Sequence, residues 1–215
     1  MRKNRTIPLK SKPKFAFVVD GECEFWYIQM LKRNERQLNV DLKPEIPQRK
    51  KLSELYQKVI DLSKDYDKVF WIIDFDVINS ETRSSKKGTK TALQEFKEYC
   101  STIESEYENI FVIINNPCLE FWILLHFETT SKYFDTCDGA SKQLKKHLKD
   151  YNKSQQYFTK QDNDIYLKLK PFLKIAISNA NKFKEFDFEN PHTAIAQMQT
   201  FFEINEIKKY FSEQQ

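Results

Sequence analysis

Three uninterrupted apolar runs constrain the fold of this chain most strongly. They cover Phe15–Val19, Val69–Ile73 and Ile110–Ile114, and each is five residues long. Runs of this length without polar alternation are typical of strands buried on both faces. Apolar residues at helical spacing separate the runs, most clearly over 52–62. We therefore predict an α/β protein whose parallel sheet is covered by helices on both faces.

The other elements follow from local patterns. A further strand is expected at 40–46 and a polar loop at 79–90, with Asn116 capping a helix that starts at Pro117 and runs to about His126. Other helices are expected at 22–34, 52–65, 91–106, 139–151 and 164–184, and a last one from Asn190.

Length and composition favour one domain with an elaboration. The 215 residues are 40% hydrophobic and 14% aromatic, which is enough for a sizeable core. We expect a flexible basic arm over 1–14, an α/β core over 15–128, and a helical C-terminal region over 129–215 packed on that core. The division is placed where the strand-helix alternation stops.

Charge is mildly positive but unevenly distributed. The net charge is +4, yet the first 14 residues carry six basic residues and no acid, and 142–174 carries nine lysines. Such clusters attract a phosphate backbone, although a lysine-rich solvated surface has the same composition. There is no apolar signal core and no run of about 20 apolar residues, so we expect a cytoplasmic protein without a membrane partner.

Glycine and cysteine usage exclude several classes of site. With three glycines, the chain has neither a P-loop nor a dinucleotide fingerprint. The four cysteines are widely spaced and indicate neither a zinc site nor a disulfide framework. Cys23 and Cys118 lie in apolar segments and are expected to be buried, reduced thiols.

Acidic residues follow or interrupt the most apolar segments. Carboxylates are costly to bury, so this placement suggests that the fold gathers them at the carboxyl ends of the strands, where open parallel sheets bind ligands. With few histidines, the set suits a hard cation such as Mg²⁺ or Mn²⁺. The candidate acids are Asp20, Glu22, Glu24, Asp74, Asp76 and Glu120.

The spacing of these acids suggests their roles. In an extended segment residues two apart point the same way, so Asp74 and Asp76 are expected to face one cation. Glu120 is expected in the first turn of the helix after the third run. Lys86 and Lys87 are candidates to hold a phosphate from the predicted loop.

Each candidate also has a structural explanation. Asp20 fits an N-cap, and Glu22 or Glu24 would favour the dipole of the following helix. The pair Asp74 and Asp76 suits a solvated loop, and Glu120 suits a partner of a basic residue. His126 suits a helix C-terminus and His192 a cap region, while Trp26, Tyr27, Trp71 and Trp122 are expected in the core.

Taken together, these motifs resemble the RloB-like family. The resemblance rests on Asp20-Gly21-Glu22-Cys23-Glu24 with Trp26-Tyr27, on Asp74-x-Asp76, on Asn116-Pro117-x-x-Glu120-x-Trp122 with His126-Phe127, and on Asn190-Pro191-x-Thr193. It spans roughly residues 15 to 205. The Asn-Pro-x-x-Glu-x-Trp block is its most specific part.

That resemblance implies a variant of the Toprim fold and its chemistry. A glutamate after the first strand and an Asp-x-Asp after a later strand would hold Mg²⁺ between them. Glu22 is the first choice for that glutamate and Glu24 the second; Asp20 stands where many members carry glutamate. The resemblance also implies a nuclease effector of an anti-phage or restriction-associated system with an ABC-type ATPase partner.

Three functions compete at this point. The first is a Mg²⁺-dependent nuclease that hydrolyses RNA or DNA phosphodiesters, with water as the nucleophile and Glu22, Asp74, Asp76 and Glu120 as the catalytic set. The second is a non-catalytic module that binds nucleic acid or the partner ATPase. The third is a primase-like nucleotidyl transferase on the same fold.

Overall fold

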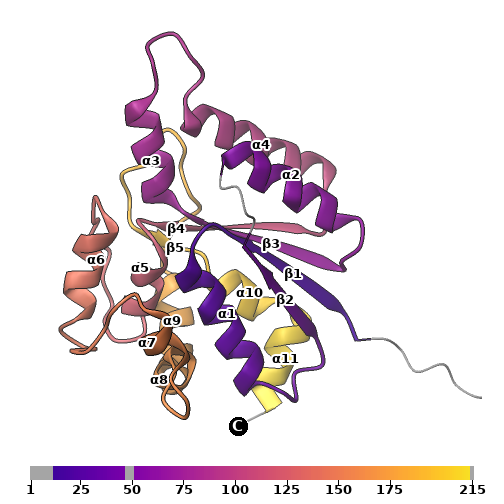
Figure 1. Ribbon diagram of the computed structural model, residues 1–215, viewed down its shortest axis with the longest axis vertical. Helices are drawn as coiled ribbons and strands as arrows, with labels where there is room; N and C mark the ends of the chain where they lie inside the picture. Colours follow the sequence, from indigo (N-terminus) through magenta and orange to yellow (C-terminus); the bar gives the residue numbers. More distant parts are fainter. Residues whose placement is uncertain (1–11, 47–50, 214–215) are drawn as a thin grey trace, which may run out of the picture.

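The computed structural model describes residues 12–46 and 51–213 and confirms an α/β architecture (Figure 1). Its sheet has the strand order β2-β1-β3-β4-β5. The first four strands pair in parallel, and the last pairs antiparallel with β4. Their bounds are β1 Lys14–Val19, β2 Asp41–Glu45, β3 Lys68–Asp74, β4 Ile110–Asn116 and β5 Ile195–Ala196.

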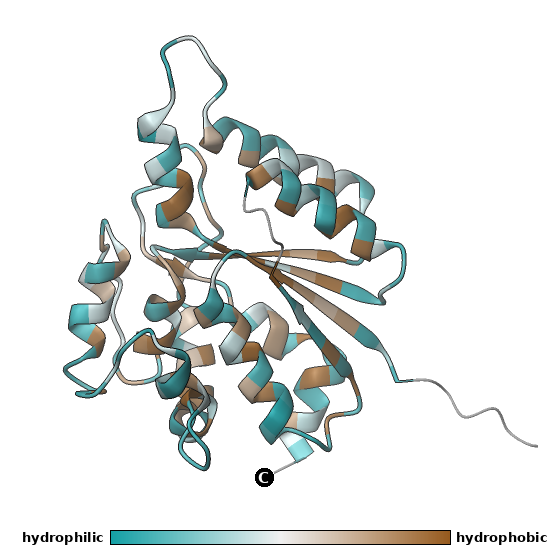
Figure 2. Cartoon of the chain, in the orientation of Figure 1, coloured by the Kyte–Doolittle hydropathy of each residue, from teal (hydrophilic) through white to brown (hydrophobic). Residues whose placement is uncertain are grey.

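The predicted buried strands are explained by two apolar layers. On one side of β1, Ala16 and Val18 pack under three helices, α2 (Leu52–Ser63), α3 (Phe75–Ser84) and α4 (Ala92–Glu106). On the other side, Phe15 and Phe17 pack under α1 (Glu22–Asn34) and the C-terminal helices. Because both faces are buried, the apolar runs in β1, β3 and β4 show no polar alternation. Figure 2 shows hydrophobic strands at the centre and hydrophilic outer helix faces.

The helices divide between these layers. The first layer contains α2 Leu52–Ser63, α3 Phe75–Ser84 and α4 Ala92–Glu106. The second contains α1 Glu22–Asn34, α5 Leu119–Leu124, α6 Cys137–Leu144, α7 Gln155–Thr159, α8 Ile165–Leu169, the 3₁₀ turn η1 Lys170–Phe172, α9 Leu173–Ala180, α10 Gln199–Glu203 and α11 Asn205–Glu213.

The predicted loop over 79–90 is wrong in its first half. Helix α3 runs to Ser84, because Phe75 and Ile78 are buried three residues apart while the rest of the helix is polar. The cap prediction for Asn116 is also wrong. Its amide donates to the carbonyls of Pro191 and Thr193, and Cys118 occupies the N-cap of α5.

The C-terminal region is helical but more broken than predicted. The single helix expected at 139–151 ends at Leu144, and the one expected at 164–184 is divided by η1, which contains Pro171. The helix expected from Asn190 is replaced by β5 and α10. Strand β5 therefore adds residues from beyond 128 to the core sheet, while residues 1–11 of the expected arm lie outside the described residues.

Candidate active site

The carboxyl ends of β1, β3 and β4 meet at one edge of the sheet, where α1, α3 and α5 begin. Parallel pairing forces this, because all three strands run in the same direction. Five acids whose charges act on one another gather there, and we call them the acid cluster: Asp20, Glu24, Asp74, Asp76 and Glu120.

Glu24 lies in the first turn of α1 and is 2% exposed. Its carboxylate folds back over Gly21, the N-cap of the helix. A Cβ at position 21 would lie 2.1 Å from Glu24 Oε2. The glycine is therefore needed for close approach, so that the glutamate can reach the sheet edge.

Glu24 and Asp74 lie close enough for the charge of Glu24 to act on Asp74. Burial and the nearby charge of Asp20 raise the pKa of Glu24 to about 8. Burial, then Glu24 and Asp20, raise the pKa of Asp74 well above its usual value. At neutral pH the two carboxyl groups therefore lack enough nearby positive charge to balance them.

Backbone amides orient the two aspartates. Asp74 Oδ1 accepts a hydrogen bond from the amide of Leu119 at 3.0 Å, and Asp76 Oδ2 accepts one from the amide of Cys137 at 3.2 Å. Burial raises the pKa of Asp76, although the Cys137 amide acts against this. The two residues do not share an extended segment as predicted, because α3 begins at Phe75 and Asp76 lies in its first turn.

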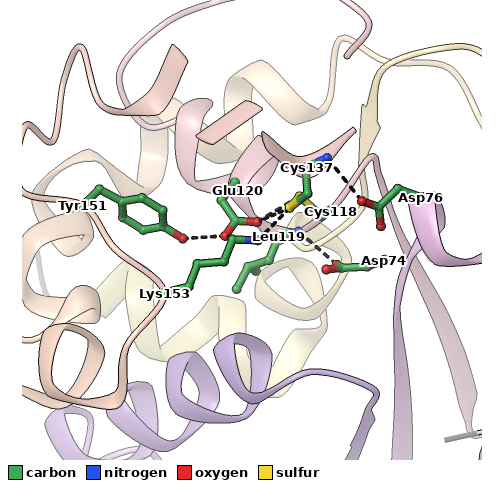
Figure 3. Close-up of a disulfide and its surroundings, with 8 residues drawn as sticks. All are labelled: Asp74, Asp76, Cys118, Leu119, Glu120, Cys137, Tyr151 and Lys153. Atoms are coloured by element: carbon green, nitrogen blue, oxygen red, sulfur yellow. Dashed lines mark hydrogen bonds and ion pairs between the residues drawn. A yellow bond between two sulfur atoms is a disulfide. The ribbon is translucent and has the colours of Figure 1, made fainter. Parts of the chain in front are cut away.

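Glu120 lies in the first turn of α5 as predicted, and it is buried. Its Oε1 accepts a hydrogen bond from Tyr151 at 2.6 Å and pairs with Lys153 Nζ at 2.9 Å. Its Oε2 lies 2.9 Å from Cys118 Sγ and 2.7 Å from Cys137 Sγ (Figure 3). Glu120 thus has a cation and a hydroxyl donor, unlike the pair Glu24 and Asp74.

Cys118 and Cys137 form a disulfide. Two predictions are therefore wrong: that Cys118 is a reduced thiol, and that the cysteines form no disulfide. The two cysteines are 19 residues apart in sequence, and contact between the start of α5 and the start of α6 brings them together. Cys23 and Cys100 are free and partly buried.

The model of the RloB-like protein family matches residues 15–202. The chain belongs to the RloB-like family. No curated protein and no solved structure matches it.

In this RloB-like chain, the two alternative glutamates point differently. Glu24 is buried against Asp74, whereas Glu22 is exposed on the same first turn. The structure therefore brings the second choice into the acid cluster. Asp20 is not the N-cap of α1, since Gly21 holds that position, and its charge acts on both Glu24 and Asp74.

The expected phosphate-binding lysines lie elsewhere in the RloB-like structure. Lys86 and Lys87 are exposed in the loop after α3, at the opposite end of that helix from Asp76 (Figure 1). Lys153 approaches the acid cluster instead. Burial lowers the pKa of Lys153, but Glu120 outweighs this and the net pKa is raised, so the side chain stays charged. Lys153 belongs to the lysine-rich stretch over 142–174, but nothing in the sequence separates it from its neighbours.

The histidines and aromatic residues serve the core or the surface. Burial lowers the pKa of His126 to about 4, so it is neutral at pH 7 and does not complement a helix dipole as expected. His192 is exposed and contacts the hydroxyl of Tyr133. As predicted, four aromatic residues are buried: Trp26, Tyr27, Trp71 and Trp122.

The donor chemistry of the acid cluster fits a hard divalent cation. The raised pKa values of three acids indicate missing counter-charge, and Mg²⁺ commonly binds one or two carboxylates while keeping several waters. The carboxylates do not converge on one point. Among the described residues, the one group of three donors within 4.8 Å of one another combines Asp74 with the sulfurs of Cys118 and Cys137.

Asn115 adds an observation that the sequence did not suggest. It pairs in register with Asp74, so the two side chains leave the sheet on the same face. It is fully buried, and neither its Oδ1 nor its Nδ2 has a hydrogen-bond partner among the described residues. An unsatisfied buried amide beside a carboxylate suits a site that holds a cation with its water.

Proposed function

We propose that this RloB-like protein is a Mg²⁺- or Mn²⁺-dependent nuclease of the Toprim type that hydrolyses nucleic-acid phosphodiesters. The observation that carries the proposal is the pair Glu24 and Asp74, buried at the carboxyl edge of the sheet with pKa values raised by burial and by neighbouring acids. Such perturbed acids cluster at functional sites, where burial and like charges shift pKa values to suit the chemistry.

In the proposed reaction Glu24, Asp74 and Asp76 hold the cation. A bound Mg²⁺ would supply polarisation of the phosphoryl oxygen and activation of water. The amides of Leu119 and Cys137 orient the two aspartates before a cation binds.

Lys153 is the basic side chain suited to the substrate phosphate. Its side chain is 43% exposed while its ammonium group contacts buried Glu120. A phosphate approaching the acid cluster would therefore meet a fixed positive charge at its rim. The lysines over 142–174 support a nucleic-acid substrate, since a phosphate backbone attracts such clusters.

Family membership supports the biological part of the proposal. We propose that the protein acts as an effector in an anti-phage or restriction-associated system with an ABC-type ATPase partner, as the resemblance to RloB-like proteins implies. In the part of the chain that the structure describes, no helix is long and apolar enough to cross a membrane.

The test is cleavage of end-labelled single-stranded RNA, transfer RNA and duplex DNA with Mg²⁺, with Mn²⁺ and with EDTA. Wild type should shorten at least one substrate in a metal-dependent way, and Asp74→Asn should not. Asp67→Asn is the matched control, because Asp67 lies just before the opposite end of the same strand β3. It should retain activity.

Other outcomes would favour the competing functions. Binding of nucleic acid without cleavage, unchanged in Asp74→Asn, would favour the non-catalytic module. Extension of a strand when nucleotides are added would favour the transferase.

A further inference from the structure

The disulfide lies between the groups that hold the two aspartates of the acid cluster. Cys118 directly precedes Leu119, whose amide binds Asp74, and the amide of Cys137 itself binds Asp76. One carboxylate oxygen of Asp74 and both sulfurs lie within 4.8 Å of one another (Figure 3). A covalent bond thus fixes the spacing between the two backbone segments that orient these acids.

We propose that Cys118 and Cys137 form a redox-exchangeable site, opened by dithiol reductants, which sets how firmly α6 holds Asp76. The oxidised form ties the start of α6 to the start of α5. The reduced form loses that tie, and the hydrogen bond from the Cys137 amide to Asp76 is then maintained by noncovalent packing alone.

Glu120 distinguishes the two forms. Its Oε2 lies against both sulfurs, at 2.9 and 2.7 Å, yet sulfurs joined in a disulfide carry no proton to donate. Two thiols at these positions would each have an acceptor ready. The buried oxygen therefore gains donors on reduction, which favours the dithiol form more than an apolar environment would.

Access favours attack on Cys137. Cys118 is 0% exposed, while Cys137 is partly exposed and its sulfur lies 2.9 Å from Lys153 Nζ. The two cysteines are thus unequally exposed, and we expect the reductant to attack Cys137 first.

The exchange balances with a dithiol reductant. Its first thiolate attacks Cys137 Sγ, the Cys118–Cys137 bond breaks, and Cys118 leaves as a thiolate and takes up a proton. The second thiol of the reductant then attacks the mixed disulfide, and Cys137 leaves beside Lys153. Overall, two electrons and two protons pass from the reductant to the cysteine pair, and the reductant becomes a disulfide.

The first measurement counts thiols in the full chain after oxidation with diamide and after reduction with dithiothreitol. Alkylation under denaturing conditions followed by intact mass should find two modified cysteines in the oxidised form and four in the reduced form, reversibly. Cys100→Ser should lower both counts by one. Four reactive thiols after oxidation would overturn the proposal.

The second measurement is amide hydrogen exchange over 134–144 in the two forms. We expect exchange there to be about tenfold faster after reduction, because a covalent restraint on local opening is lost. The variant Cys118→Ser should behave like the reduced form in both buffers, and Cys100→Ser like wild type. Equal exchange in the two wild-type forms would overturn the proposal.

A consequence for metal binding rests on the proposed function. Mn²⁺ should bind the reduced form several-fold more weakly, because Asp76 is held less firmly. The exchange rates decide the redox inference whether or not Mn²⁺ binds. Absence of Mn²⁺ binding in both forms would contradict the proposed function alone.

Discussion

The two ends of α1 each carry a buried glutamate, and they differ in what neutralises them. Glu24, in the first turn, is 2% exposed, and Glu35, just past the last turn, is 3% exposed. Burial raises the pKa of both. At Glu35 hydrogen bonds from Lys170, Tyr166 and Tyr210 outweigh burial, so its net pKa is lowered. At Glu24 the charges of further acids act in the same direction as burial, so its net pKa is raised.

This difference separates a structural acid from a candidate ligand. Glu35 ties α1 to the C-terminal helices, since its oxygens accept from Tyr166 at 2.7 Å and Tyr210 at 2.8 Å and pair with Lys170 at 2.6 Å. The charge of Glu24, by contrast, raises the pKa of another buried acid, Asp74. Burial alone therefore does not indicate function, whereas burial with unbalanced charge does.

The largest effect is expected from removing the unbalanced charge. Glu24→Gln should weaken Mn²⁺ binding at least about 100-fold and abolish cleavage, because it removes a ligand without changing shape. Its folding stability should be unchanged or higher, since repulsion with Asp74 is relieved. Isothermal titration calorimetry with Mn²⁺ and urea unfolding measure both quantities.

Glu22→Gln is the matched control for that variant. It removes the same charge from an exposed position, two residues earlier in the chain. Its Mn²⁺ affinity should remain within about twofold of wild type, because exposed charges are screened. Loss of binding in Glu22→Gln with retention in Glu24→Gln would reverse the assignment.

The opposite pattern is expected at the other end of the helix. Glu35→Ala should lower the free energy of unfolding by about 2 kcal/mol, since it leaves two hydroxyls and a lysine without their acceptor; part of the effect is screened at Lys170. Mn²⁺ affinity should not change. Urea unfolding checks the first statement and calorimetry the second.

Gly21 offers a smaller perturbation of the same site. Gly21→Ala should weaken Mn²⁺ binding about tenfold, because its Cβ would meet Glu24 Oε2 and displace that flexible carboxylate. The φ of −122° suits any residue, so the backbone should be unaffected. An unchanged affinity, measured by calorimetry, would show that the position of the Glu24 carboxylate does not matter.

A further prediction concerns the dependence of metal-free stability on pH. The pKa of Glu24 is raised to about 8 in the folded protein, so the folded state keeps a proton that the unfolded state loses above its usual range. The contribution of this proton to the free energy of unfolding is fully present below about pH 4.5. It declines as the pH rises toward 8, by about 1 kcal/mol per pH unit.

Urea unfolding in EDTA at pH 6, 7 and 8 measures that decline. Glu24→Gln should flatten it, and Mg²⁺ should offset it at pH 8 by binding the ionised form. Stability that rises over this range, equally in wild type and Glu24→Gln, would contradict the unbalanced charge.

The sequence predicts the sheet edge but not the choice between neighbouring glutamates. Buried strands and their terminal acids follow from apolar runs, which is why Asp74 and Glu120 were placed correctly at that edge. Glu24, however, shares the helix face of Ile28 and Leu31, four and seven residues on, and both are buried. The motifs alone rank Glu22 first, and this helical spacing is the sequence signal that favours Glu24 instead.

Other features depend on contacts between distant segments. Cys137, Tyr151 and Lys153 reach the acid cluster because the chain after α5 returns over it, and no local pattern encodes that return. The same is true of β5, whose two residues pair with Asn115 and Asn116. Such short pairings are set by tertiary packing and leave little periodicity to detect.

The central claim is that the pair Glu24 and Asp74 is completed by a divalent cation. Anomalous diffraction from crystals grown with Mn²⁺ tests it most directly, with Glu24→Gln crystals as the reference. The account predicts one strong anomalous peak within ligand distance of both carboxylates in wild type and none in Glu24→Gln. The absence of a peak there at saturating Mn²⁺, or a peak at exposed Glu22 instead, would contradict it.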